Sequence, residues 1–205
     1  MKINVLLLVI LAATSGCVSM STLQTARTLE EGHTRQSFGG GTYKSKSKDD
    51  TGLEIETNLP YVEYSYRMGL VKDVDLGLKV TLIGSYAADA KYQFYSDEKF
   101  AASTGFGLGY MSYKITSGST EKEVKYIDAM LPLYLSYDFA KSFSLYMSPK
   151  FIYRSASGDA TGSDQIKGLG IGAKIGDQSG VFVEAAVMKG KDSAEVMQYN
   201  LSYFW

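Results

Sequence analysis

The sequence has few of the side chains that most enzymes and metal sites use. Its 205 residues include one cysteine, Cys17, and one histidine, His33. A single cysteine excludes an intramolecular disulfide, and together with one imidazole it leaves too few ligands for a transition-metal site. A serine nucleophile needs a base close by, and His33 lies in a polar stretch near the N-terminus. These absences predict a protein that is not an enzyme and holds no cofactor or metal.

Proline and long helical patterns are also scarce. Three prolines stand against 21 glycines and 16 tyrosines, and helical periodicity is almost absent after about residue 30. This composition predicts an all-β chain with many aromatic strands and tight bends. Lysine and arginine number 21 and aspartate and glutamate 22, with no basic block. Nucleic acid is therefore not expected as a partner.

The only long apolar run lies at the N-terminus. It extends from Ile3 to Ala13, interrupted by Asn4, and follows Lys2. Eleven residues of helix rise about 16 Å, well short of the roughly 30 Å hydrocarbon core of a bilayer. Residues 1–16 are therefore predicted to be a secretory signal peptide.

The end of this segment resembles the bacterial lipoprotein box. Thr14, Ser15 and Gly16 precede Cys17, and in such a box the cysteine becomes the lipidated first residue of the mature chain. The resemblance implies lipidation at Cys17. Thr14 departs from the box, where leucine is usual, so an unmodified cysteine in an ordinary signal peptide is the alternative.

Residues 17–33 are predicted to form a polar, lipid-anchored connector in the periplasm. Leu23, Ala26 and Leu29 recur at helical spacing and Gly32 follows them, which predicts a short amphipathic helical turn. The stretch from Leu23 to Leu29 resembles the lead-in of certain small outer-membrane lipoprotein barrels of Gram-negative bacteria. With a lipid on Cys17, the start of the mature chain would lie at the periplasmic leaflet.

From residue 34 onward, turn residues divide the chain into alternating apolar and polar segments, the pattern of β-strands. About ten segments are expected, an even number that places both chain ends on one side of a membrane. The connections alternate between a longer and a shorter set, as outer loops and periplasmic turns do. Residues 34–205 are thus predicted to form one antiparallel transmembrane β-barrel. The expected strands are 34–44, 56–69, 73–83, 86–95, 99–116, 122–138, 142–155, 164–176, 180–189 and 195–205.

Charge decides which face of these strands meets lipid. In segment 73–83, Leu76 and Leu78 oppose Asp75 and Lys79. A lysine or arginine at the bilayer midplane costs roughly 2 to 4 kcal/mol, so the ionic face should point inward. Ten strands enclose little more space than side chains can fill, and these groups are predicted to pair and block much of the lumen. The predicted lumen network is Glu63, Arg67, Asp75, Lys79, Asp89, Lys91, Asp128, Lys150, Arg154, Lys174 and Glu184.

The last nine residues alternate strictly between apolar or aromatic and mostly polar side chains, and the chain ends on a tryptophan. This pattern resembles the terminal strand by which bacterial outer-membrane barrels are recognised and inserted. The resemblance implies an insertion signal at Tyr199, Leu201, Tyr203 and Trp205, the insertion machinery as a partner, and a location in the cell outer membrane. Other aromatic residues near strand ends are predicted to form interfacial girdles. The proposed girdle residues are Tyr61, Tyr66, Tyr92, Phe94, Tyr110, Tyr113, Tyr137, Tyr199, Tyr203 and Trp205.

These features favour an outer-membrane barrel that contacts lipid and has a structural or surface-interaction role, with its surface ligand unidentified. Two alternatives stay open. One is a small-solute pore. The other is a lipid-anchored soluble barrel, similar in shape to lipocalins, that holds an apolar ligand, because alternation alone does not distinguish inside from outside.

A third alternative uses carboxylates in the outer loops. Asp159 and Asp164 lie in one loop, and Asp49 and Asp50 lie in another. Such pairs could serve a hydrolase or hold a hard cation such as calcium, although no recognised ligand spacing is present.

Overall fold

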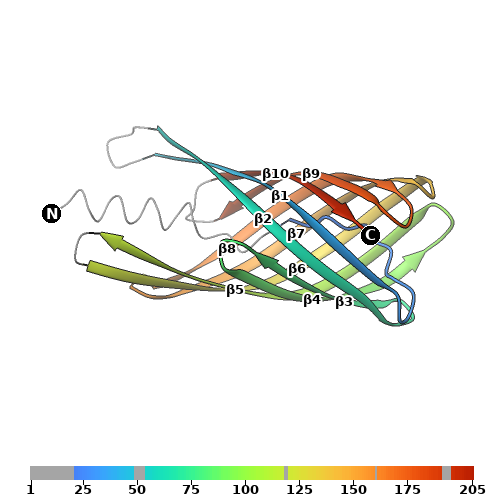
Figure 1. The fold of residues 1–205 in the computed structure, drawn as a ribbon, viewed down its shortest axis with the longest axis horizontal. Helices are drawn as coiled ribbons and strands as arrows, with labels where there is room; N and C mark the ends of the chain where they lie inside the picture. Colours follow the sequence, from blue (N-terminus) through green and yellow to red (C-terminus); the bar gives the residue numbers. More distant parts are fainter. Residues whose placement is uncertain (1–20, 49–53, 118–119, 160, 191–194) are drawn as a thin grey trace.

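The alternating segments of the sequence pair in order around a closed ring. The computed structural model of the chain describes residues 21–48, 54–117, 120–159, 161–190 and 195–205. In these residues, ten antiparallel strands form a barrel that β1 and β10 close (Figure 1). The predicted all-β barrel is confirmed. The strands are β1 (Thr34–Lys48), β2 (Glu54–Val71), β3 (Val74–Thr81), β4 (Ser85–Ser96), β5 (Phe100–Ser117), β6 (Thr120–Ala140), β7 (Phe143–Gly158), β8 (Gly162–Gly176), β9 (Gly180–Gly190) and β10 (Glu195–Phe204).

The strand ends agree closely with the sequence pattern. Most lie within two residues of the predicted position, and β1 continues furthest beyond it, to Lys48. No helix among the described residues is long and apolar enough to cross a membrane.

The two ends of the barrel differ in the length of their hairpins. Short turns at 72–73, 97–99, 141–142 and 177–179 connect strands at one end, where β1 begins and β10 ends. At the other end the β1–β2 and β5–β6 hairpins extend well past the short β3–β4 hairpin (Figure 1). In outer-membrane barrels the short turns are periplasmic and the long connections are external, and on this basis the short-turn end is called the periplasmic end below.

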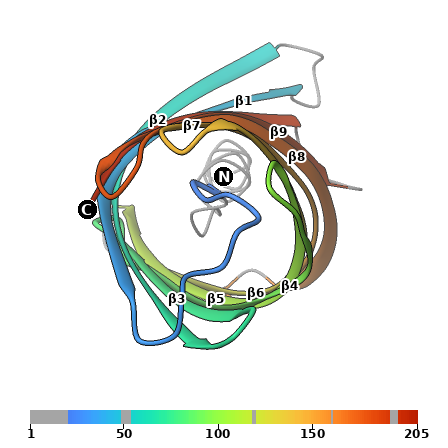
Figure 2. The same cartoon turned by 90° about the vertical axis from the view of Figure 1, so that its right-hand side faces the viewer.

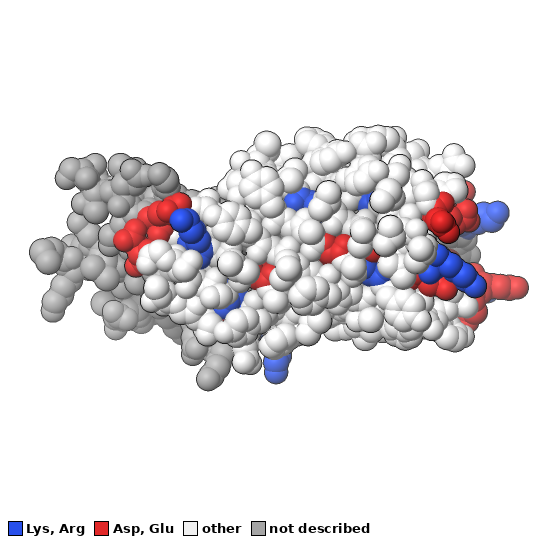
Figure 3. Space-filling model, turned by 90° about the horizontal axis from the view of Figure 1, so that it is seen from below, with Lys and Arg blue, Asp and Glu red and all other residues white. Residues whose placement is uncertain are grey.

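Apolar side chains cover the outside of the wall. Leu78 and Leu201 are 58% and 57% exposed, whereas Asp75 and Asp128 on the inner face are fully buried. From below, the largest groups of charged side chains lie at the ends of the molecule, and between them small blue and red patches are separated by uncharged surface (Figure 3). A closed barrel pairs nearly all of its backbone groups between neighbouring strands, so its apolar belt can lie in hydrocarbon. The soluble alternative requires the opposite arrangement, with the charges outside.

One predicted girdle residue points the other way. Tyr61 shares the inward face of β2 with Glu63 and is only 4% exposed. Its ring stacks on Tyr43, with 4.5 Å between the ring centroids. The interfacial position expected for Tyr61 is therefore wrong, because alternation along β2 puts it on the lumen side. The side chain of Tyr113 lies outside the described part of the structure.

The interior has a polar part and an apolar part. Towards the outer end of the strands, Tyr43, Tyr61, Ile152, Ile166 and Met188 form a buried apolar cluster. A second cluster of Met111, Val124 and Tyr126 lies beside it and shares the contact with Ile83. Most of the predicted charges lie in the remaining, periplasmic part, whereas Asp128 and Arg154 lie beside the apolar clusters, with Arg154 over the ring of Tyr126. The predicted network of charges did not include this apolar zone.

The outer rim has an exposed strand edge next to the short β3–β4 hairpin. Pairing of β2 with β3 begins at Glu63 opposite Thr81, whereas pairing of β2 with β1 continues to Glu54. The carbonyl of Val62 accepts the N–H of Leu82 (3.0 Å), so even-numbered residues of β2 face this edge. Pro60 is one of them and has no N–H to offer. It makes the edge a poorer template for pairing with another chain.

We expect an arginine on the outer face of β8 to destabilise the barrel only within the apolar belt. Ile171 is 55% exposed, between Leu169 and Ala173 on the same face. Ile171→Arg should lower the free energy of unfolding by about 2 to 4 kcal/mol. Gln165→Arg, on the same face but outside the belt, should cost much less. Urea unfolding in phospholipid vesicles, followed by fluorescence of Trp205, the one tryptophan in the sequence, measures both; equal losses would contradict the belt.

Candidate functional site

The residues before β1 lie inside the barrel. Figure 2 shows this blue stretch crossing the periplasmic mouth and entering the ring of strands. Residues 21–26 are all buried, and residues 21–29, here called the lumen segment, contain no helix. The structure thus differs from the predicted periplasmic connector and from the predicted helical turn at Leu23, Ala26 and Leu29. An extended backbone leaves its N–H and C=O groups free to bind the wall, whereas a helix would pair them internally.

Ser21 is held at the inner end of the segment by an acid and a base. Its hydroxyl donates to both carboxylate oxygens of Glu63, at 2.8 Å each. The Lys79 ammonium donates to the carbonyl and the hydroxyl of Ser21, at 2.6 and 2.7 Å. Lys79 and Glu63 are themselves 3.9 Å apart. The two wall charges therefore meet around the segment.

Glu184, on the opposite side of the β1–β10 junction, binds the next two residues. Its carboxylate accepts the backbone N–H groups of Thr22 (2.9 Å) and Leu23 (3.1 Å), and the side-chain amide of Asn200 (3.1 Å). Lys150 donates to the hydroxyl of Thr22 at 2.7 Å. A carboxylate at 2% exposure needs such donors, because burying an unsatisfied charge is costly.

Lys91 binds the middle of the segment. Its ammonium, at 1% exposure, donates to the side chain of Gln24 (3.2 Å) and to the carbonyls of Thr25 (3.1 Å) and Arg27 (2.9 Å). It also lies 3.3 Å from the Asp75 carboxylate. Backbone carbonyls thus supply most of the acceptors that a fully buried ammonium requires.

Asp75 links this contact to the wall. It pairs with Arg67 as well as Lys91 and accepts the N–H of Leu29 at 3.2 Å. The second arm of Arg67 binds Asp89 at 2.5 Å. Arg67, Asp75, Asp89 and Lys91 thus form one connected set of ion pairs, and the lumen segment joins it.

Arg27 fastens the segment at the periplasmic rim. Its guanidinium pairs with Asp138 and donates to the Ser96 hydroxyl (2.7 Å) and the Asp97 carbonyl (2.9 Å). One side chain thus donates to acceptors on β4, on the β4–β5 turn and on β6. Arginine suits this position because its planar fork supplies several donors in fixed directions.

The turn that receives Arg27 is itself ordered by the carboxylate of Asp97. This group accepts the backbone N–H groups of Phe100 (2.7 Å) and Lys99 (2.8 Å), and the Tyr95 hydroxyl (2.9 Å). These bonds hold the pKa of the Asp97 carboxyl below its ordinary value. The carboxylate form, which accepts these three bonds, therefore persists to lower pH than that of an ordinary aspartate.

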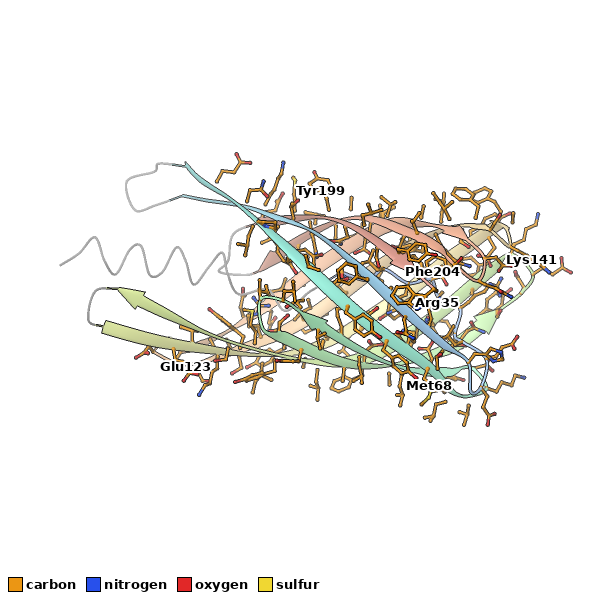
Figure 4. The ribbon with its side chains drawn as sticks, viewed as in Figure 1. Arg35, Met68, Glu123, Lys141, Tyr199 and Phe204 are labelled. Carbon is orange, nitrogen blue, oxygen red and sulfur yellow. The ribbon has the colours of Figure 1, made fainter. Side chains whose placement is uncertain are left out.

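Three predicted lumen charges lie apart from the segment. Asp128 and Arg154 pair through two hydrogen bonds of 2.8 and 2.6 Å. Lys174 and Arg35 both lie over the ring of Phe204, at 5.7 and 5.4 Å from its centroid (Figure 4). These contacts occupy the lumen beyond the segment and near its mouth.

The residues proposed as an insertion signal face outward from β10 and the residue after it. Tyr199, Leu201, Tyr203 and Trp205 are about half exposed, and Figure 4 shows Tyr199 on the outside of the wall. Trp205 also exchanges two backbone hydrogen bonds with Gln36, of 2.9 and 3.0 Å. The terminal residue thus completes the junction between β10 and β1.

Of the two carboxylates predicted for one outer loop, Asp164 lies in β8 rather than in a loop, and no metal cluster is present within the described residues. Asp159 accepts the N–H of Glu123 (2.7 Å), and Asp164 accepts that of its neighbour Gln165 (2.7 Å). His33 is exposed and lies 3.8 Å from Glu30. Cys17, Asp49 and Asp50 lie outside the described residues, so their predicted roles stay predictions.

Little free space remains beside the lumen segment. A cavity of about 80 Å³ lies between the segment and the wall, bordered by Ser21, Arg67, Tyr134 and Lys150. That volume has room for only a few water molecules. A wider vestibule of about 770 Å³ opens at the periplasmic mouth, beneath Arg27. The cavity beside residues 21–24 is thus much smaller than the vestibule, which residues 25–29 help to line.

Comparison with known proteins supports the fold. No protein-family model matches the sequence, and no curated protein matches it either. Among solved structures, an outer membrane channel from Pseudomonas putida F1 is similar over 87% of this chain and 97% of that chain, with 10% identity and a TM-score of 0.51. The outer membrane protease OmpT from Escherichia coli covers 88% and 98%, with 12% identity and a TM-score of 0.47. The attachment invasion locus protein Ail of Yersinia pestis covers 85% and 99%, with 14% identity and a TM-score of 0.44.

The chain has the fold of Gram-negative outer-membrane β-barrels. At these identities the likeness concerns the fold alone. The apolar belt agrees with this fold, because it can lie in hydrocarbon while the lumen segment lies inside the strands.

We expect Glu184→Gln to loosen the segment without opening the wall. A neutral amide cannot make charge-assisted bonds to the N–H groups of Thr22 and Leu23. Hydrogen exchange of these amides should accelerate about tenfold or more, since such bonds contribute roughly 1.5 to 3 kcal/mol. Glu195→Gln, on the exposed face of β10, is the matched control. Hydrogen exchange followed by mass spectrometry in detergent micelles measures these rates. Unchanged exchange rates of the Thr22 and Leu23 amides in Glu184→Gln would contradict the assigned contacts.

Proposed function

We propose that this outer-membrane barrel is a closed wall protein with a structural or surface-interaction role, and that it is a lipoprotein anchored at Cys17. The observation that carries the proposal is the burial of residues 21–26 inside the lumen. Wall charges from β2, β3, β4, β7 and β9 bind this segment, so its removal would strand several buried ions at once. A permanently occupied lumen favours a protein that acts through its outer surface over a protein that conducts solutes.

The apolar zone towards the outer end supports the same role. Five side chains from β1, β2, β7, β8 and β9 meet there. An apolar constriction opposes the passage of hydrated ions even where it is not completely filled, because water leaves such a passage readily. Two different obstacles thus lie in series along the lumen, one polar and one apolar.

A small-solute pore is the rival function, and conductance separates the two. The full-length mature protein in planar bilayers should show no stable, large conductance steps. A variant that begins at residue 30 removes the polar obstacle and leaves the apolar zone. It should stay closed, and it should show steps only when Ile152→Ser and Ile166→Ser are added to it; heat-modifiable gel mobility checks that each barrel is folded. Large, stable steps from the full-length protein would overturn the closed lumen and favour the pore.

The lipid anchor has a direct test of its own. Mass spectrometry of the N-terminal peptide of the mature protein should give the mass of an acylated Cys17. The variant Cys17→Ser should be released from membranes no faster than the unaltered protein, since ten strands hold the barrel in the bilayer. A peptide with a free thiol, or cleavage elsewhere, would remove the lipoprotein assignment and leave the closed lumen standing.

A further inference from the structure

We propose that the outer wall carries a binding site for a phosphorylated acyl lipid of the outer leaflet, formed by Lys167, Lys189 and an apolar groove across β5–β8. Neither lysine belongs to the lumen network. The proposal rests on the membrane location of the wall and is independent of whether the lumen conducts.

The two lysines lie directly opposite each other. Lys167 on β8 pairs in register with Lys189 on β9, and both side chains are exposed on the outer face. Like charges at directly opposed positions are destabilising. Neither ammonium has a carboxylate within 4 Å among the described residues, although Glu195 lies opposite Lys189 on its other side. An anion between the two lysines would relieve this repulsion.

Their position is the outer border of the apolar belt. Along the exposed face of β8, Ser163 and Gln165 precede Lys167, and Leu169 and Ile171 follow it. On β9 the outward residues from Val181 to Val187 are apolar and Lys189 comes next towards the outer end. Both ammonium groups therefore lie at the depth where lipid headgroups meet hydrocarbon.

A groove on the lipid-facing surface leads to Lys167. It has a volume of about 450 Å³, and apart from Thr104 and the lysine its outward lining is apolar. An acyl chain can pack in such an apolar groove, and the Lys167 ammonium at its end can pair with a phosphate. The outward-facing lining residues are Thr104, Leu131, Leu133, Pro149, Phe151 and Lys167.

Two prolines explain why the wall is indented there. The register of β5 with β6 passes from Thr104–Leu133 to Gly107–Met130, and that of β6 with β7 passes from Pro132–Lys150 to Leu135–Met147. Pro132 and Pro149 lie in these gaps, and a proline has no N–H for the ladder. The local loss of pairing, with the short proline ring in place of a long side chain, leaves the groove.

Two other lysines on the outside of the wall are already engaged. Lys44 lies 5.9 Å from the centroid of the Tyr199 ring, and Lys125 lies 3.0 Å from Glu123. They are on β1 and β6, away from the groove's charged end. Lys44 and Lys125 therefore provide a control for the effect of outward charge elsewhere on the wall.

The test measures lipid retained by the detergent-solubilised barrel in native mass spectrometry. The probe is lipid A, a bisphosphorylated and multiply acylated disaccharide. The full chain should bind one lipid A in preference to the phosphatase-treated lipid, and inorganic phosphate at the same concentration should not compete. Equal binding of the treated lipid, or full competition by phosphate, would overturn the proposal even without any variant.

The variants then locate the site. Lys167→Gln with Lys189→Gln should weaken lipid A binding at least about tenfold, since two charge-assisted contacts are lost. Lys167→Arg with Lys189→Arg should retain it, and Lys44→Gln with Lys125→Gln should change it less than about twofold. Thr104→Trp, which fills the far end of the groove, should weaken binding with both lysines intact. Equal weakening in the Lys44 and Lys125 control, or none in the Lys167 and Lys189 variant, would overturn the site.

Discussion

Ion pairing in the lumen is the constraint on which the rest of this structure depends. A barrel whose outside is apolar has to place its charged residues inside, and an interior of this size cannot hydrate them individually. Each buried charge therefore needs a partner of fixed geometry. Ion pairs such as Asp128–Arg154 and Arg67–Asp89 provide some of these partners. Backbone groups of the lumen segment provide others, for Glu184 and Lys91.

The backbone is an effective partner because it offers donors and acceptors at regular intervals. Glu184 accepts hydrogen bonds from two consecutive N–H groups, and Lys91 donates to two carbonyls that are two residues apart. A carboxylate and an ammonium are thus satisfied by the same extended peptide, which carries no net charge in its main chain. Removing the segment would leave both ions without these partners, so the network and the segment stabilise each other.

The sequence predicted the wall much better than its contents. Alternation is local, and the position of Lys79 opposite Leu78 on β3 is enough to orient that whole strand. The lumen segment depends on contacts between distant residues, such as Thr22 and Glu184, which are 162 positions apart. Leu23, Ala26 and Leu29 also have helical spacing, so the local pattern predicted a helix. In the structure the backbone groups of this segment bind wall charges instead, and the segment is extended. Tyr61 could have been placed correctly, because it shares the parity of Glu63.

The segment also acts across the junction that closes the barrel. Ser21 binds Glu63 on β2, and Thr22 binds Glu184 on β9, so two adjacent residues connect strands on either side of the β1–β10 pair. The β1–β10 ladder and this internal brace resist the same separation of strands. Because the brace precedes β1 in the chain but binds β9, it can be completed only when the last strands are in place. Docking of the lumen segment and closure of the barrel are therefore coupled steps, and each makes the other more favourable.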